Sequence, residues 1–161
     1  MQKEGVESWD RFLSPLIGLG SGLIPLTTGL DKVLFRFAPF DWPLKVLSLL
    51  LILAGFCLGS YALIENRFFS GMVRIQFERG HQVVSTGPYR WMRHPGYAGA
   101  LLVYLVTPVF LDSRWAFLPT IVISVALIIR TALEDKTLQD KLDGYTEYAR
   151  QVRYRLLPGV W

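Results

Sequence analysis

Cysteine and charged residues are both scarce in this sequence, and each shortage excludes a class of protein. Cys57 is the single cysteine among 161 residues, so no internal disulfide can form and a disulfide-stapled secreted domain is excluded. Charged residues make up 19% of the chain, below the roughly 25% of an ordinary soluble domain. Apolar residues make up 52%, which excludes a disordered chain because disorder requires low hydrophobicity. A membrane protein or an unusually apolar soluble one remains.

Charge is missing from four long runs of the sequence. Residues 12–30 and 46–64 each hold 19 residues without a charge, close to the ~20 that cross a ~30 Å hydrocarbon core. Two shorter runs follow on either side of 112–114 and predict a tight helical hairpin. We predict an all-α, polytopic membrane protein with about four spans, at 12–30, 46–64, 95–111 and 115–130. The alternative, a soluble bundle with buried helices, would have little polar surface.

Lys and Arg are unevenly divided between the two sides of this predicted bundle. The N-terminal segment, the loop 65–93 and the tail 130–161 share one side and carry 13 of the 17 basic residues. The positive-inside rule places that side in the cytoplasm. The net charge of +4 therefore reports membrane orientation, and we expect no nucleic-acid partner. The two longest polar segments meet at one membrane face, where a water-soluble ligand would bind.

A group of basic and aromatic residues precedes the third run. Proline is preorganised for the first position of a helix, so we expect the span to begin at Pro95, with His94 just outside it. Arg90 and Arg93 lie immediately before this helix N-terminus, whose free N–H groups suit a carboxylate or a phosphate. Anchoring of Arg, Trp and Tyr at the lipid headgroups is the alternative. The residues alone leave both interpretations open.

A second polar group lies at the end of the fourth run. Arg130 and Glu134 are one helical turn apart and face the same way. They form either a surface ion pair or a functional pair, in which Arg130 binds an anionic group and Glu134 accepts ligand hydrogen bonds. Apolar residues then recur at helical spacing, which predicts an amphipathic cap on the cytoplasmic face, kinked at Asp143-Gly144. These positions are Leu138, Leu142, Tyr145, Tyr148 and Val152.

Three motifs occur in a fixed order along the C-terminal two-thirds of the chain. They are Gly87-x-Tyr89-x-x-x-Arg93-His94-Pro95-x-Tyr97-x-Gly99, then Arg130-x-x-x-Glu134-Asp135, then Tyr145-x-x-Tyr148-x-x-x-Val152 before a proline-containing tail. Together they resemble the signature of the isoprenylcysteine carboxyl methyltransferase family of integral membrane methyltransferases, over roughly residues 60–161. The family has a second glutamate where this chain has Asp135, so the role of Asp135 stays open.

The resemblance implies one membrane-embedded methyltransferase domain over residues 1–161, with S-adenosylmethionine as cofactor. The cofactor region would comprise 74–99 and 130–158 at the cytoplasmic face. The implied cofactor-binding residues are Gln76, His81, Gln82, Val83, Val84, Tyr89, Arg93, His94, Pro95, Gly96, Tyr97 and Glu134. Arg130 and Glu134 are the implied catalytic residues, with Arg130 also binding the substrate, and no metal is implied. The acceptor would be a lipophilic or lipidated molecule from the bilayer, with a carboxylate among the candidates.

Two alternatives to this function remain. Membrane reductases of the sterol-reductase type, which bind NADPH, also resemble this chain in an R-H-P-x-Y segment. They typically carry Asn after the His-Pro and an acidic residue after the glycine, where this chain has Gly96 and Ala100. A non-catalytic membrane protein of the same fold is the other alternative, and the polar residues of the motifs argue against it. Family members usually have more chain before the first run, so we expect an upstream span to be missing here.

Overall fold

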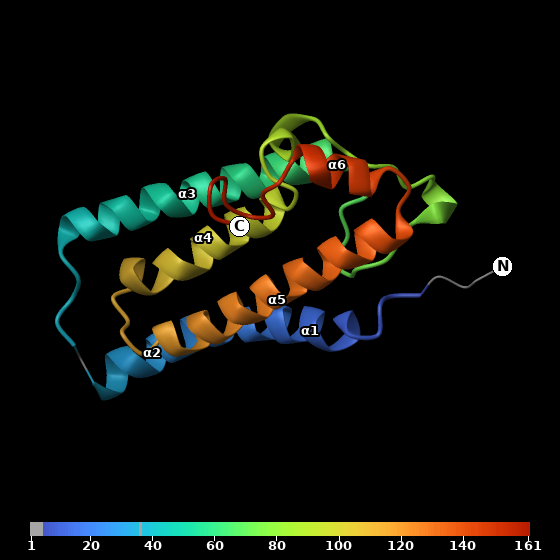
Figure 1. The fold of residues 1–161 in the computed structure, drawn as a ribbon. Coiled ribbons are helices and arrows are strands. Elements are labelled where there is room, and N and C mark those ends of the chain that lie inside the picture. The colour runs from blue at the N-terminus through green and yellow to red at the C-terminus, as the bar shows by residue number, and fades with distance from the viewer. Residues whose placement is uncertain (1–4, 36) are drawn as a thin grey trace.

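The computed structural model describes residues 5–35 and 37–161, and all regular elements within these ranges are helical (Figure 1). The helices are α1 (Asp10–Ser21), α2 (Leu23–Leu34), α3 (Trp42–Glu65), α4 (Pro95–Phe110), α5 (Phe117–Lys141) and α6 (Tyr145–Gln151). Two short 3₁₀ turns, η1 (Phe77–Arg79) and η2 (Gly87–Arg90), lie in the long connection between α3 and α4. The predicted all-α fold is confirmed.

Three stretches are long and apolar enough to cross a membrane: Asp10–Leu34, which runs through α1 and α2, then α3 and α5. The first of these is interrupted at Gly22, between α1 and α2. α4 has 16 residues, which at ~1.5 Å per residue reach ~24 Å, less than the ~30 Å hydrocarbon core. The predicted spans thus correspond to helices, and passage of α4 through the whole bilayer stays a prediction.

The last long helix extends beyond the apolar run that predicts the fourth span. The expected span ends at Arg130, and α5 continues without interruption to Lys141. The reason is that no proline or glycine interrupts the sequence before Asp143-Gly144, so the helix propagates past its apolar part. Gly144 then takes a left-handed φ of 80°, and α6 begins at the next residue. The predicted break at Asp143-Gly144 is confirmed.

α3 and α4 pack closely because glycines lie where their backbones cross. A Cβ added to Gly55 would lie 2.7 Å from the carbonyl oxygen of Gly99. A Cβ on Gly99 would lie 2.5 Å from the Gly55 carbonyl oxygen and 3.0 Å from the Gly59 nitrogen. Only residues without a side chain allow this approach. α4 also contacts α5, which in turn packs on α1, so the three contacts hold the bundle together.

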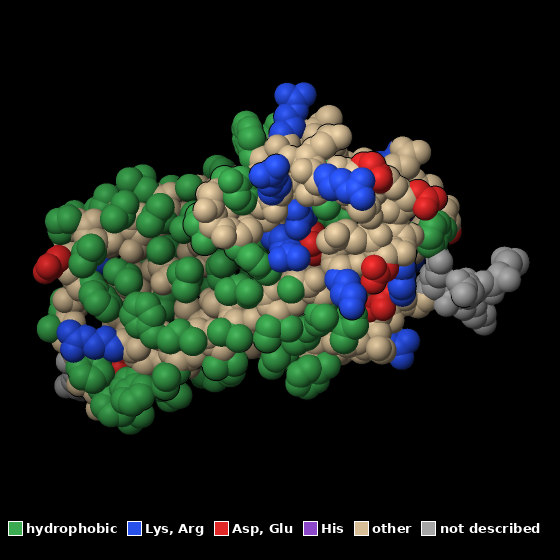
Figure 2. All heavy atoms as spheres, in the orientation of Figure 1, with side chains coloured by type: hydrophobic (Ala, Val, Ile, Leu, Met, Phe, Trp, Pro, Cys, Tyr) green, Lys and Arg blue, Asp and Glu red, His purple; other side chains and the backbone are tan. Residues whose placement is uncertain are grey.

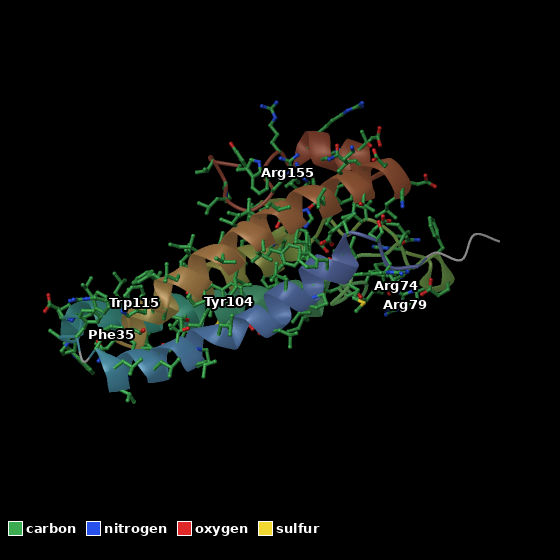
Figure 3. The ribbon with its side chains drawn as sticks, turned by 90° about the horizontal axis from the view of Figure 1, so that it is seen from below. Phe35, Arg74, Arg79, Tyr104, Trp115 and Arg155 are labelled. Atoms are coloured by element: carbon green, nitrogen blue, oxygen red, sulfur yellow. The ribbon has the colours of Figure 1, made fainter. Side chains whose placement is uncertain are left out.

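The two ends of the bundle differ in their side chains. Figure 2 shows apolar side chains over most of the helical body, and a concentration of charged ones where α6 and the end of α5 lie. We call the charged end of the bundle, where α4 begins and α5 ends, the pocket end, after the pocket described below. Arg74, Arg79 and Arg155 all lie there, whereas Phe35 and Trp115 lie at the opposite end, as Figure 3 shows. The structure therefore gathers the long polar connection and the C-terminal tail at one end.

Candidate functional site

A pocket lies at the pocket end, between the connection that follows α3, the start of α4, the last turns of α5, and α6. Ten of the twelve predicted cofactor-binding residues line it: His81, Gln82, Val83, Val84, Tyr89, Arg93, His94, Gly96, Tyr97 and Glu134. Further lining comes from α6 through Tyr145 and Tyr148, and from the segment 66–74. The fold thus brings together residues as far apart in the chain as Asn66 and Tyr148.

Two of the predicted cofactor residues do not line the pocket. The buried side chain of Gln76 donates from Nε2 to the Phe68 carbonyl oxygen at 2.6 Å and accepts a hydrogen bond from Arg79 at 2.6 Å. Gln76 therefore holds the loop together from behind the pocket wall. Pro95 is buried as the first residue of α4, where its fixed φ suits the start of the helix.

Tyr97 and Glu134 form the polar part of the wall between α4 and α5. The Tyr97 hydroxyl donates to Glu134 Oε2 at 2.6 Å. The His94 ring lies parallel to the Tyr97 ring, with 5.8 Å between their centroids. Since Tyr97 uses Glu134 Oε2, the other carboxylate oxygen has no hydrogen-bond partner within the described part of the chain. Glu134 therefore offers an acceptor to a ligand.

Asp135 is a central residue of the site, although its role was open in the sequence. Its side chain is fully buried and receives hydrogen bonds from several elements. Arg93 donates from Nε at 2.7 Å and from Nη2 at 2.9 Å, a bidentate charge-assisted pair. The other donors are Arg155 at 2.9 Å, Gln139 at 2.9 Å, Tyr145 at 3.1 Å and His94 at 3.3 Å. Asp135 thus ties the start of α4 to α6 and the tail.

Arg93 uses its remaining donors on backbone carbonyls. Its Nη1 donates to the Val152 oxygen at 2.7 Å and to the Arg153 oxygen at 3.0 Å, just past the end of α6. A cation at the C-terminus of a helix satisfies carbonyls that lack intrahelical partners. The Arg93 guanidinium therefore holds the chain that follows α6 against the pocket wall. Arg90, the other arginine before α4, does not line the pocket.

The N-terminus of α4 is partly covered by the tail. The backbone N–H of Arg93 donates to the Tyr154 oxygen, and that of His94 donates to the Arg155 oxygen, both at 2.9 Å. The N–H of Gly96 has no acceptor among the described residues and lies in the pocket wall. A Cβ on Gly96 would lie 2.7 Å from Phe69 Cε2, so a side chain there would displace the Phe69 ring. One free N–H at this helix end remains for an anion.

His81 and Tyr89 face the pocket as neutral groups. Burial, with the nearby Arg79 guanidinium, lowers the pKa of His81 below its usual 6.5. The Gln76 N–H donates to His81 Nδ1 at 3.3 Å, which leaves the ring proton on Nε2. Burial raises the pKa of Tyr89 to about 12, so its phenol keeps the proton. This side of the pocket offers uncharged donors beside Val83 and Val84, which suits a heterocycle better than an anion.

Arg130 lies behind the pocket wall and is only 5% exposed, so the surface ion pair considered for it is wrong. Its Nη1 donates to the Tyr97 hydroxyl at 2.5 Å, and its Nε donates to Asp10 Oδ1 at 2.7 Å. Tyr97 therefore stands between Arg130 and Glu134. Sequence reasoning missed Asp10, because no local pattern links two residues 120 positions apart.

Apolar helices of membrane-crossing length, with polar ends and a folded tail around a pocket, define an integral membrane protein whose site is built from the ends of its helices. The sequence profile of the isoprenylcysteine carboxyl methyltransferase (ICMT) family matches residues 46–140, more than half of the chain. The protein belongs to the isoprenylcysteine carboxyl methyltransferase family, as its motifs predicted.

Comparisons with individual proteins find similarity to enzymes of two kinds. The chain is 30% identical over 130 residues to protein-S-isoprenylcysteine O-methyltransferase A of Arabidopsis thaliana, covering 76% of this chain and 64% of that protein. It is 26% identical over 152 residues to a Delta(14)-sterol reductase of Mus musculus, covering 86% of this chain and 36% of the reductase.

A solved structure of the eukaryotic intramembrane Ras methyltransferase, isoprenylcysteine carboxyl methyltransferase, superposes with a TM-score of 0.69 at 20% identity. The superposition covers 91% of this chain and 53% of that one, and it shows that the fold is shared. The chain spans less than two thirds of the length of each of these three proteins.

Proposed function

We propose that the protein is an S-adenosylmethionine-dependent methyltransferase that acts on a carboxylate of a lipophilic acceptor taken from the bilayer. The observation that carries this proposal is the pocket itself. Ten of the twelve residues predicted for the cofactor line it, and all ten lie within the part of the chain that the family profile matches. The pocket lies at the end of the bundle rich in Lys and Arg, which supports a cytoplasmic cofactor site.

The lining residues fit the chemical parts of S-adenosylmethionine. Val83 and Val84 offer an apolar surface to the adenine, with the neutral His81 beside them as an N–H donor. The unpaired N–H of Gly96, at a helix N-terminus, suits the carboxylate of the methionine part. The free oxygen of Glu134 can accept from a hydroxyl or an ammonium group.

The protein itself needs to supply little chemistry for this reaction. S-adenosylmethionine supplies a methyl group on a sulfonium, which is already electrophilic. The chain holds the reacting groups in line and excludes water, and both effects lower the barrier. An acceptor carboxylate needs no general base, and Arg130 behind Tyr97 would orient the Tyr97 hydroxyl that faces the acceptor. An amine or hydroxyl acceptor would have to lose a proton, for which Glu134 and His94 are the available groups.

The proposal is tested first by ligand binding to the purified protein in detergent. S-adenosylhomocysteine at 100 times its Kd is expected to stabilise the fold by about 2.7 kcal/mol, measured as a rise in the thermal unfolding temperature. NADPH under the same conditions is expected to leave the temperature unchanged. Stabilisation by NADPH alone would contradict the proposal and support the reductase alternative, which the similarity to the mouse sterol reductase raises.

Turnover is tested with radiolabelled methyl-S-adenosylmethionine. N-acetyl-S-farnesylcysteine serves as the probe acceptor, because relatives of this chain are named for isoprenylcysteine. Its amide, which lacks the carboxylate, is the matched control. Label is expected in the base-labile methyl ester of the acid and not in the amide. Equal labelling of the two would rule out a carboxylate as the methylated group.

A further inference from the structure

A fully buried carboxylate lies at the first residue of α1, outside the pocket lining. Asp10 is 0% exposed. Its Oδ1 accepts from Arg130 Nε at 2.7 Å, and its Oδ2 accepts from Arg130 Nη2 at 3.2 Å. The Val73 N–H also donates to Oδ2, at 2.6 Å. A buried carboxylate is stable only with such partners, and here they belong to α5 and to the segment that lines the pocket.

This carboxylate begins a chain of contacts that ends in the pocket. Held by Asp10, Arg130 donates from Nη1 to the Tyr97 hydroxyl at 2.5 Å. A phenol has one proton, and Tyr97 donates it to Glu134 at 2.6 Å, so its oxygen accepts from Arg130. Each bond fixes the direction of the next one. Tyr97 and Glu134 line the pocket, whereas Asp10 and Arg130 stand behind it.

The same residues also fix one edge of the pocket. Arg130 Nη2 donates to the Gly71 carbonyl oxygen at 2.9 Å, and Ser14 Oγ donates to the same oxygen at 2.8 Å. The Glu7 N–H donates to the Val73 carbonyl oxygen at 3.0 Å. The first turns of α1 are thereby joined to the segment that also carries Arg74, which Figure 3 labels beside the start of α1.

Charge makes Asp10 necessary for this arrangement. Arg130 is buried between two acids, with Asp10 in direct contact and Glu134 on the far side of Tyr97. Without Asp10, the guanidinium would lose its counter-charge, and Glu134, four residues along the same helix, would be the remaining acid within reach. Glu134 would then be engaged by Arg130 and lost to the ligand.

We infer that Asp10 is a positioning residue of the methyltransferase site: through Arg130 it orients the Tyr97 hydroxyl and the Glu134 carboxylate that face the ligand. The inference rests on the proposed function. It assigns a task in the site to the first helix, which lies outside the matched residues 46–140. Asp10 acts through Arg130 and touches neither cofactor nor acceptor.

The test is a double-mutant cycle on turnover with N-acetyl-S-farnesylcysteine and S-adenosylmethionine. Asp10→Asn is expected to lower kcat at least tenfold, and Asp10→Glu, which keeps the charge, is expected to recover part of that loss. In an Arg130→Gln background, Asp10→Asn is expected to change kcat less than twofold, because no cation remains to be positioned. Ser21→Ala, which removes a hydroxyl of α1 that donates to the Gly18 carbonyl oxygen of the same helix, is the matched control and is expected to stay within twofold of wild type.

The outcomes separate the two proposals. Wild-type protein that binds no S-adenosylhomocysteine would overturn the proposed function, and this inference with it. Wild-type binding together with normal kcat in Asp10→Asn would overturn the inference alone. Equal losses from Asp10→Asn in both backgrounds would show a purely structural role and also overturn it. If Asp10→Asn alone does not fold, the test uses the double variant Asp10→Asn/Arg130→Gln. A kcat equal to that of Arg130→Gln supports the inference, and a kcat a further fivefold lower contradicts it.

Discussion

The two ends of the helical bundle both hold acidic side chains that accept several hydrogen bonds, but these side chains do different things. At the opposite end, Asp112 accepts from Lys45 at 2.6 Å and from the Phe40 N–H at 2.9 Å, and Asp31 accepts from Ser113 at 2.7 Å. These bonds close turns between helices. At the pocket end, Asp135 by itself gathers donors from the residues just before α4, from α5, from α6 and from the tail.

This difference shows how a small membrane protein makes room for a ligand. Bonds that close a turn join two neighbouring segments of backbone. A buried carboxylate with many donors holds several segments at a distance set by side-chain length, and the pocket lies among those segments. Such networks are stable only when every member is satisfied. Changes at the pocket end should therefore cost more than changes at the opposite end.

The largest effect is expected from Arg93→Ala. It removes the bidentate partner of Asp135 and the donor to the carbonyls past α6. Removing one partner of a buried pair costs about 3–5 kcal/mol, so we expect a large fall in the thermal unfolding temperature and loss of S-adenosylhomocysteine binding. Limited proteolysis should cleave the tail after α6. A variant as stable as wild type would show that the Asp135 cluster does not hold the pocket end.

The second prediction concerns the contact between α3 and α4. Gly99→Ala places a Cβ 2.5 Å from the Gly55 carbonyl oxygen, and backbone cannot move aside as a side chain can. Overpacking of this kind costs about 1–3 kcal/mol, measured by thermal unfolding in detergent. Gly18→Ala is the control, because nothing lies within 4 Å of its added Cβ. Equal stability of the two variants would contradict the close packing.

A smaller effect is expected at the opposite end, from Asp112→Asn. The substitution keeps an acceptor for the Phe40 N–H and tolerates the positive φ of 56° at this position, but it removes the charge that faces Lys45. Partly exposed ion pairs contribute about 0–1 kcal/mol. We expect a loss of stability in that range and an unchanged Kd for S-adenosylhomocysteine. A change in that Kd would mean that the two ends are coupled.

The smallest effect is a pH dependence at the pocket end. The pKa of His81 is lowered in the folded protein from 6.5 by burial and by Arg79. The unfolded chain therefore binds more protons as pH falls below about 6.5, and stability decreases from there down to the lowered pKa. His81→Gln should remove this part of the pH profile of thermal unfolding. An unchanged profile in that variant would show that another group titrates.

Much of the fold and part of the site could be predicted from the sequence. The apolar runs predicted the helices, and Asp143-Gly144 predicted the break before α6, because local hydrophobicity and backbone freedom act on neighbours in the chain. α5 continues past the apolar run that ends at Arg130, since the change from apolar to charged residues there marks a change of surroundings and not of helix propensity. Glu134 lines the pocket, as the resemblance to the family implied.

The contacts that order the site lie beyond any local pattern. Asp10 meets Arg130 across 120 positions, and Arg93 meets Asp135 across 42. Hydrogen bonds of this kind depend on which helices pack together and in what register, and that is decided by side-chain packing over the whole bundle. The sequence by itself determined that the chain is helical, lies in a membrane and carries its polar residues at one end. Only the tertiary structure decided which of those residues face the pocket and which, like Arg130 and Gln76, support it from behind.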